Sequence, residues 1–197
     1  MATLGEGERA AVEDLLAASA ADDEPLPVQR PRVAVWRLED LKPLADRDAT
    51  PGDAKRGAAI FREALCSRCH RAGATGPAVG PDLTFVARRF DRGDMLEAIV
   101  EPSRSVAENY RNVSIVTDSG RVLTGRLAAT GDFRAEKLRL NVDPLRPGQV
   151  VEIDKKEVEE QRLDDTSPMP KGLLDGFTRA EIADLLAFLE GGVRESP

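Results

Sequence analysis

The sequence predicts an α+β fold in which a run of short strands interrupts a helical domain. Apolar residues recur at helical spacing in residues 54–65, 94–101 and 178–190 of the 197-residue chain, whereas residues 105–166 contain short alternating runs. The helical residues 50–104 and 167–197 therefore enclose the β residues 105–166. We expect an all-α core interrupted by a small antiparallel β barrel or sheet, preceded by an N-terminal helix and linker at residues 1–49.

The N-terminal part divides at a proline-containing stretch. Residues 6–21 carry apolar side chains and alanines at helical spacing, and residues 22–31 are acidic and contain three prolines. This pattern predicts a short amphipathic helix followed by a linker. Residues 33–36 then favour a short extended segment with Trp36 as its apolar anchor.

The first helix of the core is expected at residues 54–65. Asp53 follows Pro51 and Gly52 and is a natural N-cap, and Ile60 and Phe61 lie on one helical stripe with Gly57. A glycine inside a helix costs about 1 kcal/mol relative to alanine. Gly57 therefore predicts a close crossing with another helix.

Two capping boxes indicate further helices. Asp94 and Glu97 form a D-x-x-E pattern that opens a helix ended by Pro102. Thr178 and Glu181 form a second box, before a helix that glycines 191–192 end.

Five short strands are expected between these helices. Residues 118–120 form a tight glycine turn between the first two strands. The strands are predicted at residues 110–116, 122–127, 138–140, 150–153 and 158–163. Small β barrels often bind RNA, but these strands show no basic excess and almost no aromatic platform, so we expect no nucleic-acid partner.

The functional signal is the pentapeptide at residues 66–70, Cys-Ser-Arg-Cys-His. It contains both cysteines and the only histidine of the chain. C-x-x-C-H is the pattern of covalent c-type haem attachment, in which the cysteines form thioethers to the porphyrin and the histidine ligates the iron. The sequence predicts one covalent haem c, bound by Cys66 and Cys69, with His70 as an iron ligand.

Three other interpretations of the motif compete with this one. Structural zinc requires four nitrogen or sulfur ligands, and the chain offers three. A dithiol redox pair usually follows a strand in a βαβ unit, whereas a helical pattern precedes this motif. A chance match with two inert cysteines is the third.

The segments after the motif suit a bound haem. Residues 71–83 are rich in glycine and proline and can wrap closely around a flat ligand, and a rigid turn at Gly80 and Pro81 suits a carbonyl that orients the ligating imidazole. Met169 lies between two prolines, which hold it in an extended loop. It is the candidate for the sixth iron ligand.

Residues 52–192 resemble a class I cytochrome c. The resemblance rests on Gly57 and Phe61 in the first helix, the C-x-x-C-H motif, Gly80-Pro81-x-Leu83, and a final helix with an aromatic residue. Within that class the chain is similar to haem-binding domains of planctomycetes and verrucomicrobia, on residues 80–84, 101–103, 167–170 and 172–174. The β residues before Met169 are an insertion relative to ordinary members, and Phe61 lies one residue further from the first cysteine.

The resemblance implies a role for each candidate residue. Thioethers would form at Cys66 and Cys69, His70 would be the proximal ligand, and Met169 the distal one. The carbonyl of Pro81 would accept a hydrogen bond from the imidazole, and Leu83 would pack on the haem.

Other distal arrangements stay open. Met169 could be core filler, and Met95 is expected in a helix core. The other candidates for a distal ligand are Tyr110 and three lysines, namely Lys155, Lys156 and Lys171.

Charge and composition restrict the partners. The net charge of −7 argues against nucleic acid or an anionic membrane as the main partner. A helix that spans a bilayer needs a run of about 18 apolar residues, and the sequence contains no such run. Six arginines crowd around the haem motif and are expected to pair haem propionates or to steer an acidic partner, with a merely solvated basic face as the alternative. They are Arg62, Arg68, Arg71, Arg88, Arg89 and Arg92.

The expected location is periplasmic or otherwise exported, because thioether haem is installed outside the cytoplasm. The first nine residues lack the features of a secretory signal, so we expect a piece of a longer exported protein.

The function predicted first is one-electron transfer by an electron carrier, with a redox partner such as a fused or associated dehydrogenase. A haem enzyme or a gas or redox sensor with an open or labile distal site is the alternative. A docking module in which the β insertion matters more than the haem is the third possibility.

Overall fold

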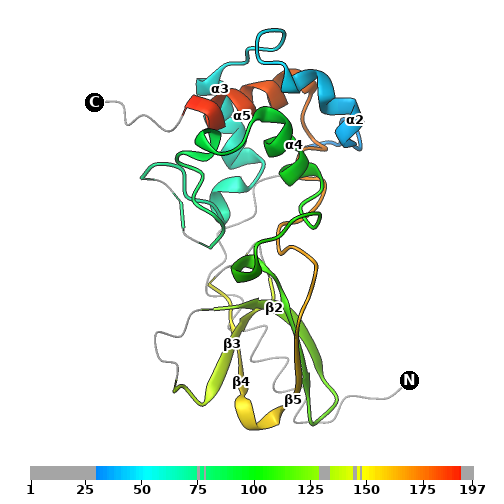
Figure 1. Cartoon of the computed structure of the whole chain (residues 1–197), viewed down its shortest axis with the longest axis vertical. Helices are drawn as coiled ribbons and strands as arrows, with labels where there is room; N and C mark the ends of the chain where they lie inside the picture. Colours follow the sequence, from blue (N-terminus) through cyan, green and yellow to red (C-terminus); the bar gives the residue numbers. More distant parts are fainter. Residues whose placement is uncertain are drawn as a thin grey trace.

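The computed structural model describes residues 30–74, 76–77, 79–128, 134–143, 146 and 148–191. The helix predicted at residues 6–21, nearly all of the linker and Gly192 lie outside these residues. Figure 1 shows the helices gathered in one body and the strands in a second, joined by the segments that follow α4 and precede α5.

The helical body is organised around the contact between α3 (Ala54–Glu63) and α5 (Arg179–Gly191). A methyl group added at Gly57 would lie 2.0 Å from the carbonyl oxygen of Asp184, so the helices cross with their backbones nearly in contact. The rings of Phe61 and Phe188 pack beside this crossing with centroids 5.3 Å apart. The helix crossing predicted from Gly57 is confirmed.

The caps of these two helices agree with the sequence. The Asp53 carboxylate accepts hydrogen bonds from the backbone N–H groups of Lys55 and Arg56, at 2.8 and 3.1 Å. Thr178 and Glu181 form the predicted capping box before α5, with the Thr178 N–H 2.8 Å from the Glu181 carboxylate.

Helix α4 (Arg92–Val100) begins earlier than predicted. Its N-cap is Asp91, which exchanges hydrogen bonds with Asp94 in a capping box, so Asp94 is the third helical residue and not the cap. Before α3, the chain forms the short helix α2 (Leu38–Leu41) and a 3-10 turn at Lys42–Ala45, which the sequence pattern did not predict.

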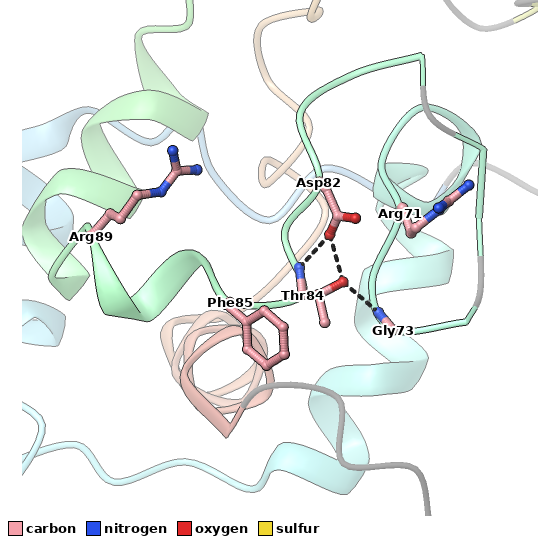
Figure 2. Close-up of a pocket in the computed structure, with 6 residues that line it drawn as sticks. All are labelled: Arg71, Gly73, Asp82, Thr84, Phe85 and Arg89. Carbon is pink, nitrogen blue, oxygen red and sulfur yellow. Dashed lines mark hydrogen bonds between the residues drawn. The ribbon is translucent and has the colours of Figure 1, made fainter.

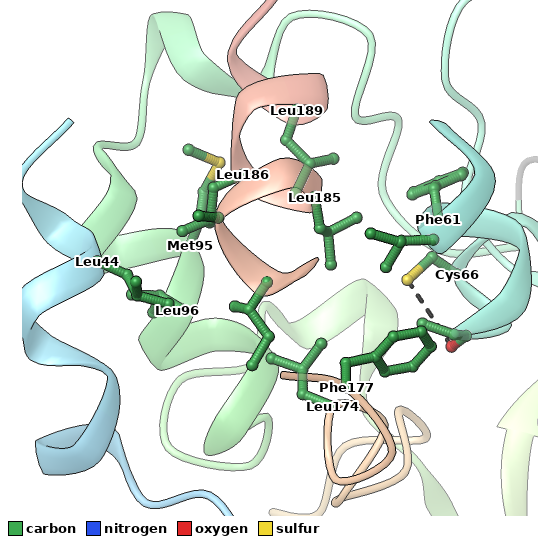
Figure 3. Close-up of a cluster of buried hydrophobic side chains, with 14 of the residues drawn as sticks. Leu44, Phe61, Cys66, Met95, Leu96, Leu174, Phe177, Leu185, Leu186 and Leu189 are labelled. Atoms are coloured by element: carbon green, nitrogen blue, oxygen red, sulfur yellow. Dashed lines mark hydrogen bonds between the residues drawn. The ribbon is translucent and has the colours of Figure 1, made fainter. Parts of the chain in front are cut away.

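These helices enclose one hydrophobic core, part of which Figure 3 shows. The core draws side chains from every helix of the body, and Cys66 belongs to it together with Phe61 of α3. Met95 is 4% exposed within it, as expected for a helix-core residue. Its labelled members in the figure are Leu44, Phe61, Cys66, Met95, Leu96, Leu174, Phe177, Leu185, Leu186 and Leu189.

The segment before α2 is tied to the loop before α5. The indole N–H of Trp36 donates to the carbonyl oxygen of Phe177 at 3.0 Å, and the backbone of residues 33–34 donates to the carbonyl oxygen of Asp175. Trp36 also packs against the core, in agreement with its predicted role as an anchor.

The second body is a five-stranded antiparallel sheet in the order β4-β3-β2-β1-β5. The sheet is open, so of the two predicted arrangements the sheet is correct and the barrel is not. Its strands are β1 (Val113–Thr117), β2 (Val122–Leu127), β3 (Lys137–Asn141), β4 (Val151–Asp154) and β5 (Val158–Leu163).

The sheet has its own small core of Val113, Ile115, Leu140 and Ile153, which shares no residue with the helical core. Its first and last strands are paired, and the N–H of Asp164 donates to the carbonyl oxygen of Asn112 at 2.8 Å. The chain therefore enters and leaves the sheet at neighbouring points.

Among the described residues, no helix has the length and apolar character needed to cross a bilayer.

Candidate functional site

The pentapeptide at residues 66–70 begins at a sharp break after α3. Leu65 has a φ of +63° in the left-handed region, which a leucine rarely adopts, so the helix stops short of the predicted residue 65. A 3-10 turn at Cys66–Arg68 follows, and the N–H groups of Cys69 and His70 both donate to the carbonyl oxygen of Cys66. This compact turn brings both cysteines and the histidine together.

The two thiols lie in different surroundings. Cys66 is buried and Cys69 is half-buried. Burial raises the pKa of Cys66 to about 12, and it also raises the pKa of Cys69 against the opposing charges of Arg126 and Arg68. A reactive dithiol needs a thiolate near neutral pH, so these pKa shifts speak against the redox-pair interpretation.

The His70 ring is held in one orientation by the loop that follows it. Its Nδ1 atom lies 2.8 Å from the carbonyl oxygen of Pro81. Burial lowers the pKa of the imidazole, which favours the neutral ring, although the Pro81 contact acts in the opposite sense. A neutral ring that donates from Nδ1 leaves the Nε2 lone pair available to a metal.

Two glycines allow the loop to approach the histidine closely. A methyl group added at Gly80 would lie 2.7 Å from the ring of His70, and one at Gly76 would lie 2.3 Å from the His70 carbonyl oxygen. The Gly80 N–H donates to the carbonyl oxygen of Cys69 at 2.7 Å, and the Leu83 N–H donates to that of Arg71 at 2.8 Å. The loop therefore forms a close cradle around the histidine.

A short series of hydrogen bonds links the two ends of this loop and braces it. The Asp82 carboxylate accepts hydrogen bonds from the hydroxyl and N–H groups of Thr84, and the Thr84 hydroxyl accepts one from the N–H of Gly73 (Figure 2). The Thr84 hydrogen bonds lower the pKa of Asp82. A surface pocket of about 390 Å³ lies over this brace, lined also by Arg71, Phe85 and Arg89.

Leu83 packs partly buried against the helical core. Met169 is half-buried in the loop between β5 and α5. Its N–H donates to the Ser167 hydroxyl at 3.2 Å, and the Ser167 N–H donates to the hydroxyl of Ser103 at 3.1 Å. These bonds tie the Met169 loop to the segment after α4.

The other candidates for a distal ligand differ in position. Lys155 and Lys156 are exposed in the turn between β4 and β5, at the end of the sheet away from the helices (Figure 1). Lys171 is exposed as well. Tyr110 is half-buried at the junction of the two bodies, where the guanidinium of Arg126 lies 5.1 Å from its ring centre.

Arg92 does not belong to the predicted basic face around the haem motif. Its side chain is 1% exposed and forms an ion pair with Glu190 at 2.9 Å. It also donates to the carbonyl oxygens of Thr50 and Pro51. These bonds make Arg92 a structural link between α4, α5 and the start of α3.

Arg88 and Arg89 do lie at the surface, each over an exposed aromatic ring. The Arg88 guanidinium is 4.4 Å from the ring centre of Phe85, and that of Arg89 is 5.5 Å from the ring centre of Phe90. Phe85 and Phe90 are 58% and 45% exposed. We call Arg71, Phe85, Arg88, Arg89 and Phe90 the basic aromatic surface.

One residue near the site has no counterpart among the residues predicted from the sequence. Arg126 of β2 donates from Nη1 to the carbonyl oxygen of Val79, in the loop that cradles His70. The sequence carries no local signal for this contact, because the sheet brings together residues that are far apart in the chain.

The residues present fit a covalently attached haem. Paired cysteines adjoin a histidine whose Nδ1 is engaged by a carbonyl, one thiol faces an apolar core, and glycines keep the surrounding loop close. This donor set suits iron in a porphyrin.

Comparison with known proteins agrees with this geometry. Residues 54–111 match the family model for cytochrome c. The matched region contains the C-x-x-C-H motif and the whole of the loop that cradles His70. It supports a c-type cytochrome domain in this part of the chain, with a covalently bound c-type haem and electron transfer in general. No curated protein matches the chain.

Proposed function

We propose that this protein is a monohaem c-type cytochrome that carries single electrons. In this proposal Cys66 and Cys69 would hold the haem through thioethers, and His70 and Met169 would ligate its iron. The observation that carries the proposal is the contact of 2.8 Å between His70 Nδ1 and the Pro81 carbonyl oxygen, directly after the paired cysteines.

When bound, the haem supplies an iron that alternates between two oxidation states. The protein's part is to orient and enclose it. The Pro81 carbonyl fixes the imidazole ring, and the brace of Asp82, Thr84 and Gly73 keeps that carbonyl in position.

Met169 suits the distal position because a thioether is a soft ligand that favours the reduced iron and raises the potential. The prolines on either side of it restrict its loop, and the Ser167 and Ser103 hydrogen bonds anchor the loop to the helical body. A distal methionine favours an electron carrier over an enzyme with an open site.

The separation of the two hydrophobic cores supports the domain division predicted from the sequence. We assign residues 50–104 and 167–197 to the haem domain and residues 105–166 to an inserted β subdomain. The motifs at residues 80–84 and 167–170 support the planctomycete and verrucomicrobial type of haem domain.

The partner in this proposal is an acidic redox protein, such as a fused or associated dehydrogenase, in the periplasm or another exported compartment. The basic aromatic surface supports that choice, because its arginines stand out on a chain of net charge −7. Its exposed rings supply apolar contact area beside the cradle of His70.

Extraction of the haem tests the attachment directly. The protein is produced with the machinery that attaches haem c, denatured, and treated with acidified organic solvent. Haem should stay with the wild-type chain and with a Ser67→Ala control, and it should be extracted from the double variant Cys66→Ala and Cys69→Ala.

Two results would overturn the assignment. One is wild-type protein from which the solvent removes all haem. The other is a double variant that keeps haem bound after denaturation.

A further inference from the structure

The β sheet sends one charged side chain toward the haem loop. This side chain belongs to Arg126 of β2. Its neighbour Gly125 pairs with β1, whereas Arg126 itself pairs with β3. A methyl group added at Gly125 would lie 2.2 Å from the carbonyl oxygen of Asn141, so the two strands are in close contact there. The backbone of Arg126 is therefore held firmly.

The partner strand is fixed as well. Asn141 pairs with Arg126 in the sheet, and its side-chain amide donates to the carbonyl oxygens of Arg146 and Gln149 at 2.9 and 2.8 Å. A long arginine side chain placed on such a rigid base has a defined reach.

The guanidinium of Arg126 makes a hydrogen bond through one nitrogen and a cation–π contact through its face. Its Nη1 donates to the carbonyl oxygen of Val79, and its plane lies over the ring of Tyr110. Its charge also acts on the thiol of Cys69. These contacts place the guanidinium between the sheet and the haem-attachment turn.

The Nε–H group of the Arg126 guanidinium has no hydrogen-bond acceptor among the described residues. The Nε atom is buried, and no oxygen or nitrogen of the described residues accepts a hydrogen bond from it. A buried donor without an acceptor is destabilising, so its presence calls for an acceptor that arrives with a ligand.

We propose that Arg126 binds a haem propionate, so that the inserted sheet supplies part of the haem site. This inference rests on the proposed function, since it requires a haem at Cys66 and Cys69. A haem carries two propionate side chains, and their carboxylates are its anionic groups. The Nε edge of a guanidinium forms paired hydrogen bonds to a carboxylate, which matches the unsatisfied donor.

The proposal predicts how the haem responds to removal of this charge. Arg126→Gln removes a cation that keeps a propionate ionised and that opposes the ferric state. The midpoint potential of the variant should fall at alkaline pH. It should rise again toward the wild-type value as the pH is lowered, because the pKa of the propionate shifts upward and the group takes up a proton.

The experiment is a potentiometric titration of the haem protein from acidic to alkaline pH, followed in the visible spectrum. Arg121→Gln is the matched control, because Arg121 is an exposed arginine of the same hairpin. The control should follow the wild-type curve at every pH. Identical curves for the Arg126 variant, the control and the wild type would overturn the proposal and leave the electron-carrier function intact, since the haem would still be bound and redox-active.

A second measurement needs no variant and applies even if Arg126→Gln fails to fold. The propionate bending bands in the resonance Raman spectrum of the wild type report hydrogen bonding to the carboxylates. One propionate should show a hydrogen bond that is insensitive to salt, and two bands typical of solvated carboxylates would overturn the proposal. A wild type without covalent haem would instead overturn the proposed function itself.

Discussion

Asp184 shows how one buried carboxylate joins the two helices at the centre of the helical body. It is 4% exposed, and it accepts hydrogen bonds from the N–H of Asp53 at 2.6 Å and from the Nε of Arg56 at 2.8 Å. The Arg56 hydrogen bond, more than any other contact, lowers the pKa of Asp184, while desolvation opposes it. The ionised form therefore stabilises the fold.

The pH dependence of this contribution has a definite sign. A carboxyl group whose pKa is lowered in the folded state stabilises the protein above its unfolded pKa of about 3.9, and the contribution is lost as the pH falls through the folded pKa. Asp184→Asn should cost about 1–3 kcal/mol of unfolding free energy at pH 7, and less as the solution is acidified below pH of about 4. Denaturant unfolding at several pH values measures this.

Asp48→Asn is the control for that series, because Asp48 is exposed. Its unfolding free energy should follow the wild type throughout. A penalty for Asp184→Asn that stays constant down to the most acidic pH would refute the assigned role of the charge.

At the scale of elements, the crossing of α3 and α5 depends on the absence of a side chain at Gly57. Gly57→Ala should cost about 1–3 kcal/mol of unfolding free energy, because its methyl group would overlap the Asp184 carbonyl. Gly191→Ala, at the exposed end of α5, meets no atom within 4 Å and should be neutral or slightly stabilising. Thermal or denaturant unfolding of the two variants distinguishes them, and equal stabilities would contradict the close crossing.

Elements with strong local signals could be predicted from the sequence. The strands at residues 122–127 and 158–163 have the bounds of β2 and β5, because apolar residues stand at both ends of each strand and a glycine turn at Gly120 precedes the first. The predicted cap of α4 was wrong by three residues, because Asp91 and Asp94 each begin a possible capping box. The earlier start is favoured by Arg92, whose buried bonds to Glu190 and Thr50 depend on the tertiary fold.

The residues of the candidate site also differ in whether local sequence predicts them. The cysteines, His70 and the Pro81 turn lie within 16 consecutive residues, so local sequence was enough to propose their relation. Arg126 could not be found in this way. Its approach to Val79 depends on the register of β2 and β3 and on the position of the sheet relative to the helices.

At the scale of the whole molecule, the sheet is built as a separable unit. Its ends meet at the Asn112 to Asp164 hydrogen bond, and its core shares no residue with that of the helices. Replacing residues 113–163 by two glycines should therefore leave a folded protein with covalent haem. Its midpoint potential at alkaline pH should fall in the same direction as that of Arg126→Gln, because both changes remove the same cation.

Absorption spectroscopy and potentiometry of the shortened protein measure these outcomes. Loss of the covalent haem or of the helical fold would show that the sheet is needed for folding of the helical body.

In the proposed function, His70 and Met169 close the haem iron, which serves electron transfer. The most direct measurement is the visible and far-red spectrum of the ferric protein, with and without cyanide, together with the spectrum of the ferrous protein under carbon monoxide. The wild type and a Met95→Leu control should show the weak far-red band of sulfur bound to ferric iron and should resist both ligands. Met169→Ala should lose the band, bind the ligands and have a lower potential. A wild type that lacks the band and binds carbon monoxide readily would contradict ligation by Met169 and would favour a haem enzyme or sensor.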